Sequence, residues 1–195
     1  MTNGTSQIPL RGLRTVFLDR DGILNEKMPE GRYVTRWDEF RVLPGVPAAI
    51  RRLNEAGLRV IVVSNQRGIA LGLYSIGDVD AIHAKLQQQL AQAGAHLDAI
   101  FVCPHDRDQC NCRKPLPGMF EQAVAQFPEI TAAASVIIGD SLSDMEFGRH
   151  LGMRTIFVEV DAHQRKSNAE QASLLAGMRC ASLPEAVNTL LAQHD

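Results

Sequence analysis

The 195-residue sequence has no long run of apolar residues, few aromatic side chains and no excess of either charge. A membrane-spanning helix needs about 20 consecutive apolar residues, and no segment approaches that length. The chain has 20 Lys and Arg against 22 Asp and Glu, and 5% of its residues are aromatic. Nucleic-acid-binding modules normally show a basic excess and aromatic residues for base stacking. The composition therefore argues against a membrane protein and against a nucleic-acid-binding module.

Residues 1–14 are polar and lack the apolar core of a secretory signal, so we expect a cytoplasmic protein. In that reducing compartment the 4 cysteines are expected to be metal ligands or free thiols. At about 150 residues per domain, the length predicts a flexible tail over residues 1–13 and a single domain over 14–195. We expect a monomer that binds a small molecule and neither nucleic acid nor membrane.

Short apolar runs alternate with amphipathic segments along the chain. The continuously apolar runs predict strands buried on both faces of a sheet, at residues 16–18, 60–63, 100–102, 136–138 and 155–158. Helical spacing of apolar residues predicts helices near 46–56, 79–93, 117–127, 143–151, 168–175 and 183–192. This alternation predicts an α/β fold with a doubly wound, mostly parallel sheet and helices on both faces.

Polar residues follow the predicted strands, where ligands of such sheets bind. They are Asp19 and Asp21 after the first strand, Ser64 after the second, Lys114 at the end of the loop after the third, and Asp140 and Asp144 after the fourth. Any one of these motifs could consist of helix caps and turn residues. Together they place carboxylates beside a lysine, which suits Mg2+ binding and phosphoryl transfer to a carboxylate.

These residues resemble the four motifs of the haloacid dehalogenase (HAD) phosphohydrolase superfamily. The matching motifs are Asp19-x-Asp21-Gly22, Ser64-Asn65, Lys114-Pro115 and Gly139-Asp140-x-x-x-Asp144. The resemblance implies that Asp19 is the nucleophile that forms an aspartyl-phosphate intermediate and that Asp21 is the general acid and base. It also implies that Ser64 and Lys114 hold the transferred phosphoryl group.

The same resemblance implies a Mg2+ site. Its ligands would be the Asp19 side chain, the Asp21 backbone carbonyl and the Asp140 side chain, with Asp144 orienting a ligand. The intervals between the motifs leave no room for an inserted cap domain, so we expect a HAD-like domain without a cap and with an open active site. Residues 26–40 form the only long loop expected beside that site.

The loop after the third predicted strand contains a cluster of metal-ligand residue types. They follow the pattern C-x-H-x4-C-x-C, formed by Cys103, His105, Cys110 and Cys112. This density predicts a closed, structural zinc site, and the alternative is a set of free thiols beside a surface histidine. Zinc at this position would fix Arg113 and Lys114, which follow directly. Cys180 stands apart and is expected to be a core residue.

The combined pattern is similar to two families of HAD phosphatases: D-glycero-D-manno-heptose 1,7-bisphosphate phosphatases and histidinol-phosphate phosphatases. Asn25 and the cation Arg67 favour the heptose family, because a bisphosphate would be attracted by Arg67 and Arg113 and a cationic substrate repelled. Candidate substrate-binding residues are Asn25, Asn65, Gln66, Arg67, Arg113 and Ser141.

Membership of the heptose family would imply removal of the 7-phosphate in nucleotide-activated heptose synthesis for lipopolysaccharide or another surface polysaccharide. Two other functions remain open at this point. One is a histidinol-phosphate phosphatase of histidine biosynthesis. The other is a polynucleotide 3′-phosphatase or a nucleic-acid-binding module built on the zinc loop, against which the net charge of −2 and the few aromatic residues count.

Overall fold

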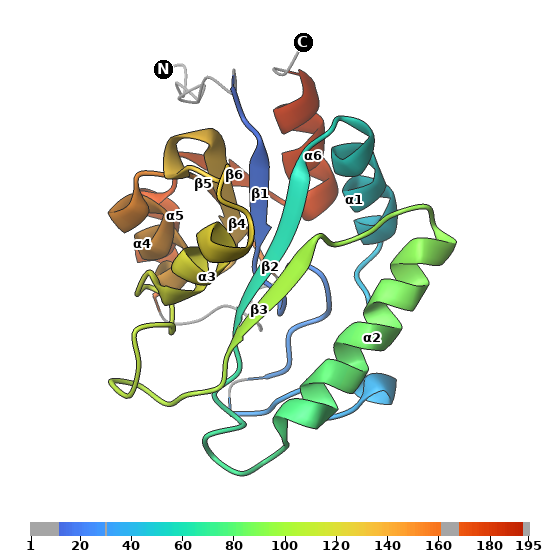
Figure 1. Cartoon of the computed structure of the whole chain (residues 1–195), viewed down its shortest axis with the longest axis vertical. Coiled ribbons are helices and arrows are strands. Elements are labelled where there is room, and N and C mark those ends of the chain that lie inside the picture. The colour runs from blue at the N-terminus through green and yellow to red at the C-terminus, as the bar shows by residue number, and fades with distance from the viewer. Residues whose placement is uncertain (1–11, 30, 161–167, 193–195) are drawn as a thin grey trace.

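The computed structural model describes residues 12–29, 31–160 and 168–192, which form a parallel sheet between two layers of helices (Figure 1). The strands are β1 (Thr15–Leu18), β2 (Arg59–Asn65), β3 (Ala99–Cys103), β4 (Ser135–Gly139), β5 (Arg154–Val158) and β6 (Met178–Cys180). Their order in the sheet is β3-β2-β1-β4-β5-β6, and every pairing is parallel. The predicted doubly wound α/β fold is confirmed.

Strand β1 lies at the centre of the sheet. Leu18 pairs with Val62 of β2 on one side and with Ile138 of β4 on the other. All four residues of β1 are buried, as are all five of β4. The apolar runs of the sequence therefore mark strands covered on both faces, as a parallel sheet requires.

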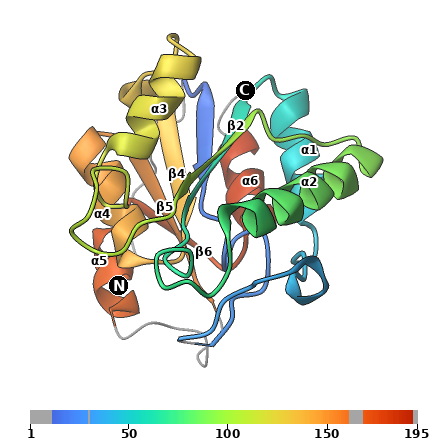
Figure 2. The ribbon, with the colours of Figure 1, turned by 60° about the horizontal axis from the view of Figure 1, so that its bottom comes forward.

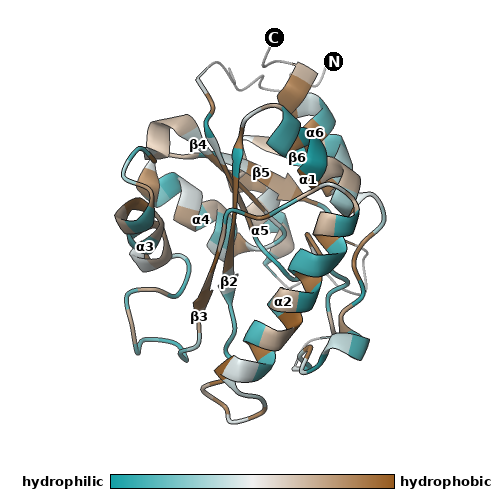
Figure 3. Ribbon diagram, turned by 45° about the vertical axis from the view of Figure 1, so that its right-hand side comes forward, coloured by the Kyte–Doolittle hydropathy of each residue, from teal (hydrophilic) through white to brown (hydrophobic). Residues whose placement is uncertain are grey.

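Helices cover both faces of the sheet. They are α1 (Val46–Glu55), α2 (Ile76–Gln92), α3 (Gly118–Gln126), α4 (Leu142–Leu151), α5 (Ala169–Leu175) and α6 (Leu183–Ala192), with 3-10 turns at Trp37–Glu39 and Ala132–Ala134. In Figure 1, α1, α2 and α6 lie on one side of the sheet and α3, α4 and α5 on the other. In Figure 3, α2 alternates between hydrophilic and hydrophobic residues, as expected for a helix with one face on the core.

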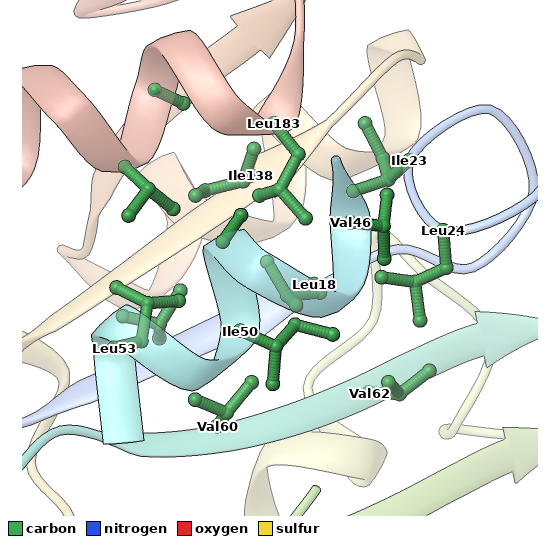
Figure 4. Packing of buried hydrophobic residues seen from close by; sticks show 14 of the residues in the cluster. Leu18, Ile23, Leu24, Val46, Ile50, Leu53, Val60, Val62, Ile138 and Leu183 are labelled. Carbon is green, nitrogen blue, oxygen red and sulfur yellow. The ribbon is translucent and has the colours of Figure 1, made fainter. Parts of the chain in front are cut away.

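The larger core lies between the sheet and helices α1, α2 and α6. Figure 4 shows Ile50 and Leu53 of α1 packed over Leu18, Val60 and Val62 of the strands. A smaller cluster on the opposite face joins Phe17 and Ile137 to Met119 of α3 and Phe147 of α4. The two cores hold the central strands firmly, so the ends of these strands are fixed points on which a site can be built.

Two features of the fold bear on the sequence predictions. Strand β6 was not predicted, because it has only three residues and its middle one, Arg179, is exposed. The tail predicted over residues 1–13 lies outside the described residues except for Gly12 and Leu13, and Leu13 is buried.

Cys180 is buried in the core, as expected. Among the described residues, no helix is both long and apolar enough to cross a membrane.

Candidate active site

The loops that follow β1, β2 and β3 gather at one end of the molecule (Figure 2). They enclose a pocket of about 550 Å³. Its lining includes Asp19 and Asp21 after β1, Asn65 at the end of β2, Lys114 in the loop after β3 and Ser141 after β4. The strand ends thus bring together residues from four separate motifs. This convergence is what the sequence predicted for a parallel sheet.

Asp19 lies at the floor of the pocket beside a buried lysine. The ammonium of Lys114 donates to Asp19 Oδ1 at 2.9 Å and to the Val63 carbonyl at 2.7 Å, and lies 2.6 Å from Asp144 Oδ1. Burial raises the pKa of Asp19 to about 6, although Lys114 opposes the shift. Although burial disfavours the ammonium, Asp144 and Asp19 raise the pKa of Lys114. A positive charge is therefore held against the carboxylate that the sequence motifs predict as the nucleophile.

Asp21 accepts hydrogen bonds from three different side chains. Arg20 donates to both of its oxygens, with the shortest contacts at 2.9 Å. The amides of Asn25 and Gln66 each donate at 3.0 Å. Burial of Asp21 raises its pKa, but the charge of Arg20 and these hydrogen bonds outweigh that effect, so the net pKa is lowered. The carboxylate is fixed at the pocket wall.

The turn after β2 connects the two sides of the pocket. Gln66 donates to Asp21 and to Ser64 Oγ, the latter at 2.8 Å, and accepts from the Tyr74 hydroxyl at 2.7 Å. Asn65 exchanges two hydrogen bonds with the backbone of Lys114, at 3.0 and 3.1 Å. The side chain of Ser64 is therefore placed by Gln66, and the backbone of Lys114 by Asn65.

The side chains of Asp19, Asp140 and Asp144 offer carboxylate oxygens that lie within 4.8 Å of one another. Oxygen ligands of this kind are what Mg2+ prefers, so the donor set fits that ion. The ammonium of Lys27, from the loop after β1, contacts Asp140 and marks this place as one that attracts a cation. Gly22 approaches Asp140 so closely that a side chain there would collide with it.

The four predicted zinc ligands are brought together in one cluster. The ligand atoms of Cys103, His105, Cys110 and Cys112 all lie within 4.8 Å of one another. Cys103 Sγ is 3.5 Å from Cys110 Sγ, and His105 Nδ1 is 3.3 Å from Cys112 Sγ. A tetrahedral zinc ion with arms of about 2.3 Å to sulfur and about 2.0 Å to nitrogen gives edges of about 3.5–3.8 Å. The residues therefore fit a closed zinc site.

Cations surround the mouth of the pocket. Arg32, Arg107 and Arg113 line it, and none of the three forms an ion pair with another of the described residues. Arg67 also lines the pocket, but its guanidinium pairs with Asp106 of the zinc loop at 2.5 and 3.1 Å. Arg67 therefore bridges two loops, in addition to any contact with substrate.

The predicted substrate-binding residues differ in how far they face the pocket. Asn65, Gln66, Arg67, Arg113 and Ser141 line it, whereas Asn25 does not and is fully buried. The Ser141 hydroxyl also donates to Asp144 at the start of α4. Their roles as substrate ligands stay predictions, and inward hydrogen bonds indicate that Asn25 and Gln66 position Asp21.

Sequence reasoning did not single out several pocket residues. Those with polar side chains beyond the predicted motifs include Lys27, Arg32, Tyr33 and Arg107. The first three lie in the loop over residues 26–40, which was expected beside the site, but an irregular loop has no periodicity that shows which side chains turn inward. Arg107 lies between the predicted zinc ligands His105 and Cys110. The only sequence signal for its position in the pocket was that a loop closed around a metal would carry Arg107 with it.

The fold and the site define a phosphatase of the HAD class, in which the nucleophile and the acid-base residue follow the first strand. A HAD-hydrolase-like family model matches residues 111–183. This stretch includes Lys114, which donates to Asp19, and Asp140, whose carboxylate lies within 4.8 Å of that of Asp19.

The chain is also similar to individual phosphatases. It is 42% identical over 137 residues to a D-glycero-alpha-D-manno-heptose-1,7-bisphosphate 7-phosphatase of Mycobacterium tuberculosis, covering 70% of this chain and 72% of the relative. It is 38% identical over 181 residues to the corresponding beta-anomer enzyme of Bordetella bronchiseptica, covering 92% and 98%. The chain belongs to the family of D-glycero-D-manno-heptose-1,7-bisphosphate 7-phosphatases.

A solved structure supports the same assignment. The D,D-heptose 1,7-bisphosphate phosphatase of B. bronchiseptica, complexed with magnesium and phosphate, has a TM-score of 0.81 and 34% identity. The match covers 93% of this chain and 99% of that chain. The resemblance noted from the sequence motifs is confirmed at the level of the family, of the fold and of a phosphoric monoester hydrolase.

Proposed function

We propose that the protein removes the 7-phosphate of D-glycero-D-manno-heptose 1,7-bisphosphate, in the synthesis of nucleotide-activated heptose for a surface polysaccharide. The observation that carries this proposal is a pocket with Asp19 and Lys114 at its floor and Arg32, Arg107 and Arg113 at its mouth. A bisphosphate matches such a pocket, because one phosphate reaches the floor while the other meets the guanidinium groups. Histidinol phosphate would bring an ammonium into the same cationic mouth.

The residues support a two-step hydrolysis. Asp19 attacks phosphorus while Lys114 offsets the charge of the phosphoryl oxygens, and the leaving sugar oxygen takes a proton from the carboxylic acid form of Asp21, which becomes a carboxylate. Water then attacks the phosphorus of the aspartyl phosphate and gives a proton to Asp21, which restores the carboxylate of Asp19. Mg2+ held by Asp19, Asp140 and the Asp21 carbonyl would supply charge stabilisation to the transferred group.

We further propose that the cysteine cluster holds a structural zinc ion. Four protein ligands leave no open position for water, so this ion would act on the loop alone. Arg113 and Lys114 directly follow Cys112, and Lys114 reaches the floor of the pocket. Zinc would therefore fix the position from which both cations enter the site.

The substrate assignment is tested by phosphate release across a panel. The panel contains both anomers of heptose 1,7-bisphosphate, histidinol phosphate and DNA with a 3′-phosphate, assayed with Mg2+. We expect the heptose bisphosphates to give a kcat/KM at least about tenfold above the other two. A preference for histidinol phosphate or for DNA would replace the proposal by one of the alternative functions.

Three broader expectations accompany this proposal. They concern a monomer, a small sugar phosphate as the only class of ligand, and a location in the cytoplasm. Light scattering of the purified protein tests the first, salt-sensitive binding to single-stranded DNA would contradict the second, and cell fractionation tests the third.

A further inference from the structure

Arg20 is the largest of the fully buried side chains among the described residues, with an exposed fraction of 1%. A buried guanidinium is costly unless it is paired and hydrogen bonded. It lies between the carboxylate of Asp21 and the ring of Phe40, 5.6 Å from the centre of that ring. We propose that Arg20 is a positioning residue of the reaction, which fixes the carboxyl group of Asp21 at the pocket wall, where it gives a proton to the leaving group and takes one from the attacking water.

The contacts with Asp21 define one orientation of the carboxylate. Arg20 donates from Nη2 to both oxygens, at 2.9 Å each, and from Nε to Oδ1 at 3.2 Å. A planar guanidinium that meets both oxygens fixes the plane of the carboxylate, which a single ammonium cannot do. Asn25 and Gln66 complete this arrangement from two other directions. Proton transfer needs heavy atoms within about 2.6–3.2 Å, so the orientation of Asp21 decides its efficiency.

The backbone of Arg20 organises the segment that follows. Its carbonyl accepts hydrogen bonds from the backbone N–H groups of Ile23, Leu24 and Asn25, at 3.3, 2.8 and 3.3 Å. Phe40, beneath the guanidinium, ends the loop over residues 26–40, which provides several pocket-lining side chains. Arg20 thereby joins the acid-base residue to the loop on which the substrate would lie.

Among the described residues, the charge of Arg20 is matched by Asp21 alone. The positive charge of Arg20 also acts on Tyr74 and on His83 of α2, and burial together with this charge lowers the pKa of His83 to about 4. His83 is therefore neutral and does not compete for Asp21. The guanidinium is committed to the carboxylate, which distinguishes it from a cation of the pocket mouth.

The inference rests on the proposed hydrolysis through Asp21, and its test uses leaving groups that need a proton to different degrees. The substrates are aryl phosphates, from p-nitrophenyl phosphate to phenyl phosphate, whose leaving phenols become increasingly basic. The measured quantity is kcat/KM for phenol release, which reports the steps up to departure of the phenol. General acid catalysis contributes about 10²–10⁴-fold and matters most for the more basic leaving group.

We expect Arg20→Lys to lower kcat/KM on phenyl phosphate about ten- to a hundredfold more than on p-nitrophenyl phosphate. Lysine keeps the charge and much of the buried stem, so this variant is chosen to fold even if Arg20→Gln does not. Asp21→Asn should show the same selective loss. In the double variant Arg20→Lys/Asp21→Asn, the selective loss should not increase further, because both changes remove one function.

Arg59 offers a matched control. It also lies over a phenylalanine ring, 4.2 Å from the centre of Phe127, and pairs with Glu129. Arg59 is the first residue of β2, however, so it lies at the end of the strand that points away from the pocket. Arg59→Lys should change kcat/KM equally on both aryl phosphates. This comparison separates positioning of Asp21 from a general loss of stability.

Equal losses on both substrates in Arg20→Lys, or additive selective losses in the double variant, would overturn the inference. Neither outcome depends on the natural substrate, because the aryl phosphates are simple monoesters. A wild-type protein that cleaves them but not heptose bisphosphate would contradict the proposed substrate and leave the role of Arg20 standing.

Discussion

Asp19 combines burial with a lysine partner, and both bear on its reactivity. We expect Asp19→Asn to abolish turnover, because the amide is neutral and a poor nucleophile. The fold should persist, since asparagine is nearly the same size and can still accept a hydrogen bond from Lys114. Phosphate release by the purified variant, with circular dichroism as a check on folding, measures this. Near-normal phosphate release would remove Asp19 from its role.

Asp140 is the second carboxylate whose proposed role can be tested, because Mg2+ binding can be measured independently of folding. Replacing it by alanine should weaken Mg2+ binding and activity together, because one of the oxygen ligands is lost. Calorimetric titration with Mg2+ tests this. Zinc content serves as the control, since the cysteine cluster shares no residue with this site. Wild-type magnesium affinity in Asp140→Ala would contradict the assignment.

At the scale of single residues, the sequence could place Asp19, Ser64, Lys114 and Asp140 at one site because each stands at the carboxyl end of a strand or in the loop beyond it. It could not show that Gln66 turns inward to Asp21 and Ser64. That direction depends on the packing of Tyr74 from beyond the turn, a contact that no local pattern encodes.

The loop that carries the cysteine cluster is an element whose position we expect to depend on the proposed zinc ion. Cys110→Ser should remove about one zinc ion per chain and lower both activity and melting temperature, because the closed loop no longer fixes Arg113 and Lys114. Elemental analysis and a thermal melt measure these effects. Careful preparations of wild-type protein that contain no zinc would end this idea.

The junction between β4 and α4 depends on a glycine. A Cβ atom at Gly139 would collide with the side chain of Asp144, which contacts Lys114 and accepts from the Ser141 hydroxyl. We expect Gly139→Ala to displace Asp144 and to reduce kcat by at least about tenfold. Steady-state kinetics on p-nitrophenyl phosphate provides the measurement.

Gly77 in the first turn of α2 is the control for this change. A Cβ atom there would be 3.6 Å from Ser75 Oγ, an ordinary contact. Gly77→Ala should therefore remain active and gain stability of about 0.5–1 kcal/mol from the better helix former. If Gly139→Ala were as active as Gly77→Ala, Asp144 would have no positioning role.

The elements of the core were predictable because burial on both faces leaves a continuous apolar run, as in β1 and β4. Strand β6 escaped prediction because it alternates and is short. The paths of the loops over the pocket could not be predicted either, because ion pairs such as Arg67 with Asp106 join segments far apart in the chain.

At the scale of the whole molecule, the ion pair between Arg67 and Asp106 joins the turn after β2 to the loop that carries the cysteine cluster. Arg67→Ala should lower kcat/KM on heptose bisphosphate about ten- to a hundredfold and leave p-nitrophenyl phosphate nearly unchanged. The comparison of Asp106→Asn with Arg67→Ala identifies the reason. If Arg67 binds the phosphate that is not cleaved, Asp106→Asn frees the guanidinium and spares activity.

If Arg67 instead acts by holding the zinc loop, Asp106→Asn should cause the same loss as Arg67→Ala. Equal losses on both substrates in Arg67→Ala would place the residue in the common reaction or in the fold. Unchanged kcat/KM on both would make Arg67 a surface charge without a part in catalysis.

The parallel register places Leu18, Val62 and Ile138 side by side, so the residues after them start from one line across the sheet. The register of the sheet thus sets the relative positions of the catalytic groups. One residue inserted within β1 would advance Asp19 by about 3.3 Å and turn its side chain to the other face. Length changes are therefore more tolerable in the loop over 26–40, and between His105 and Cys110, than in the central strands, which must keep their residue count for the catalytic groups to stay aligned.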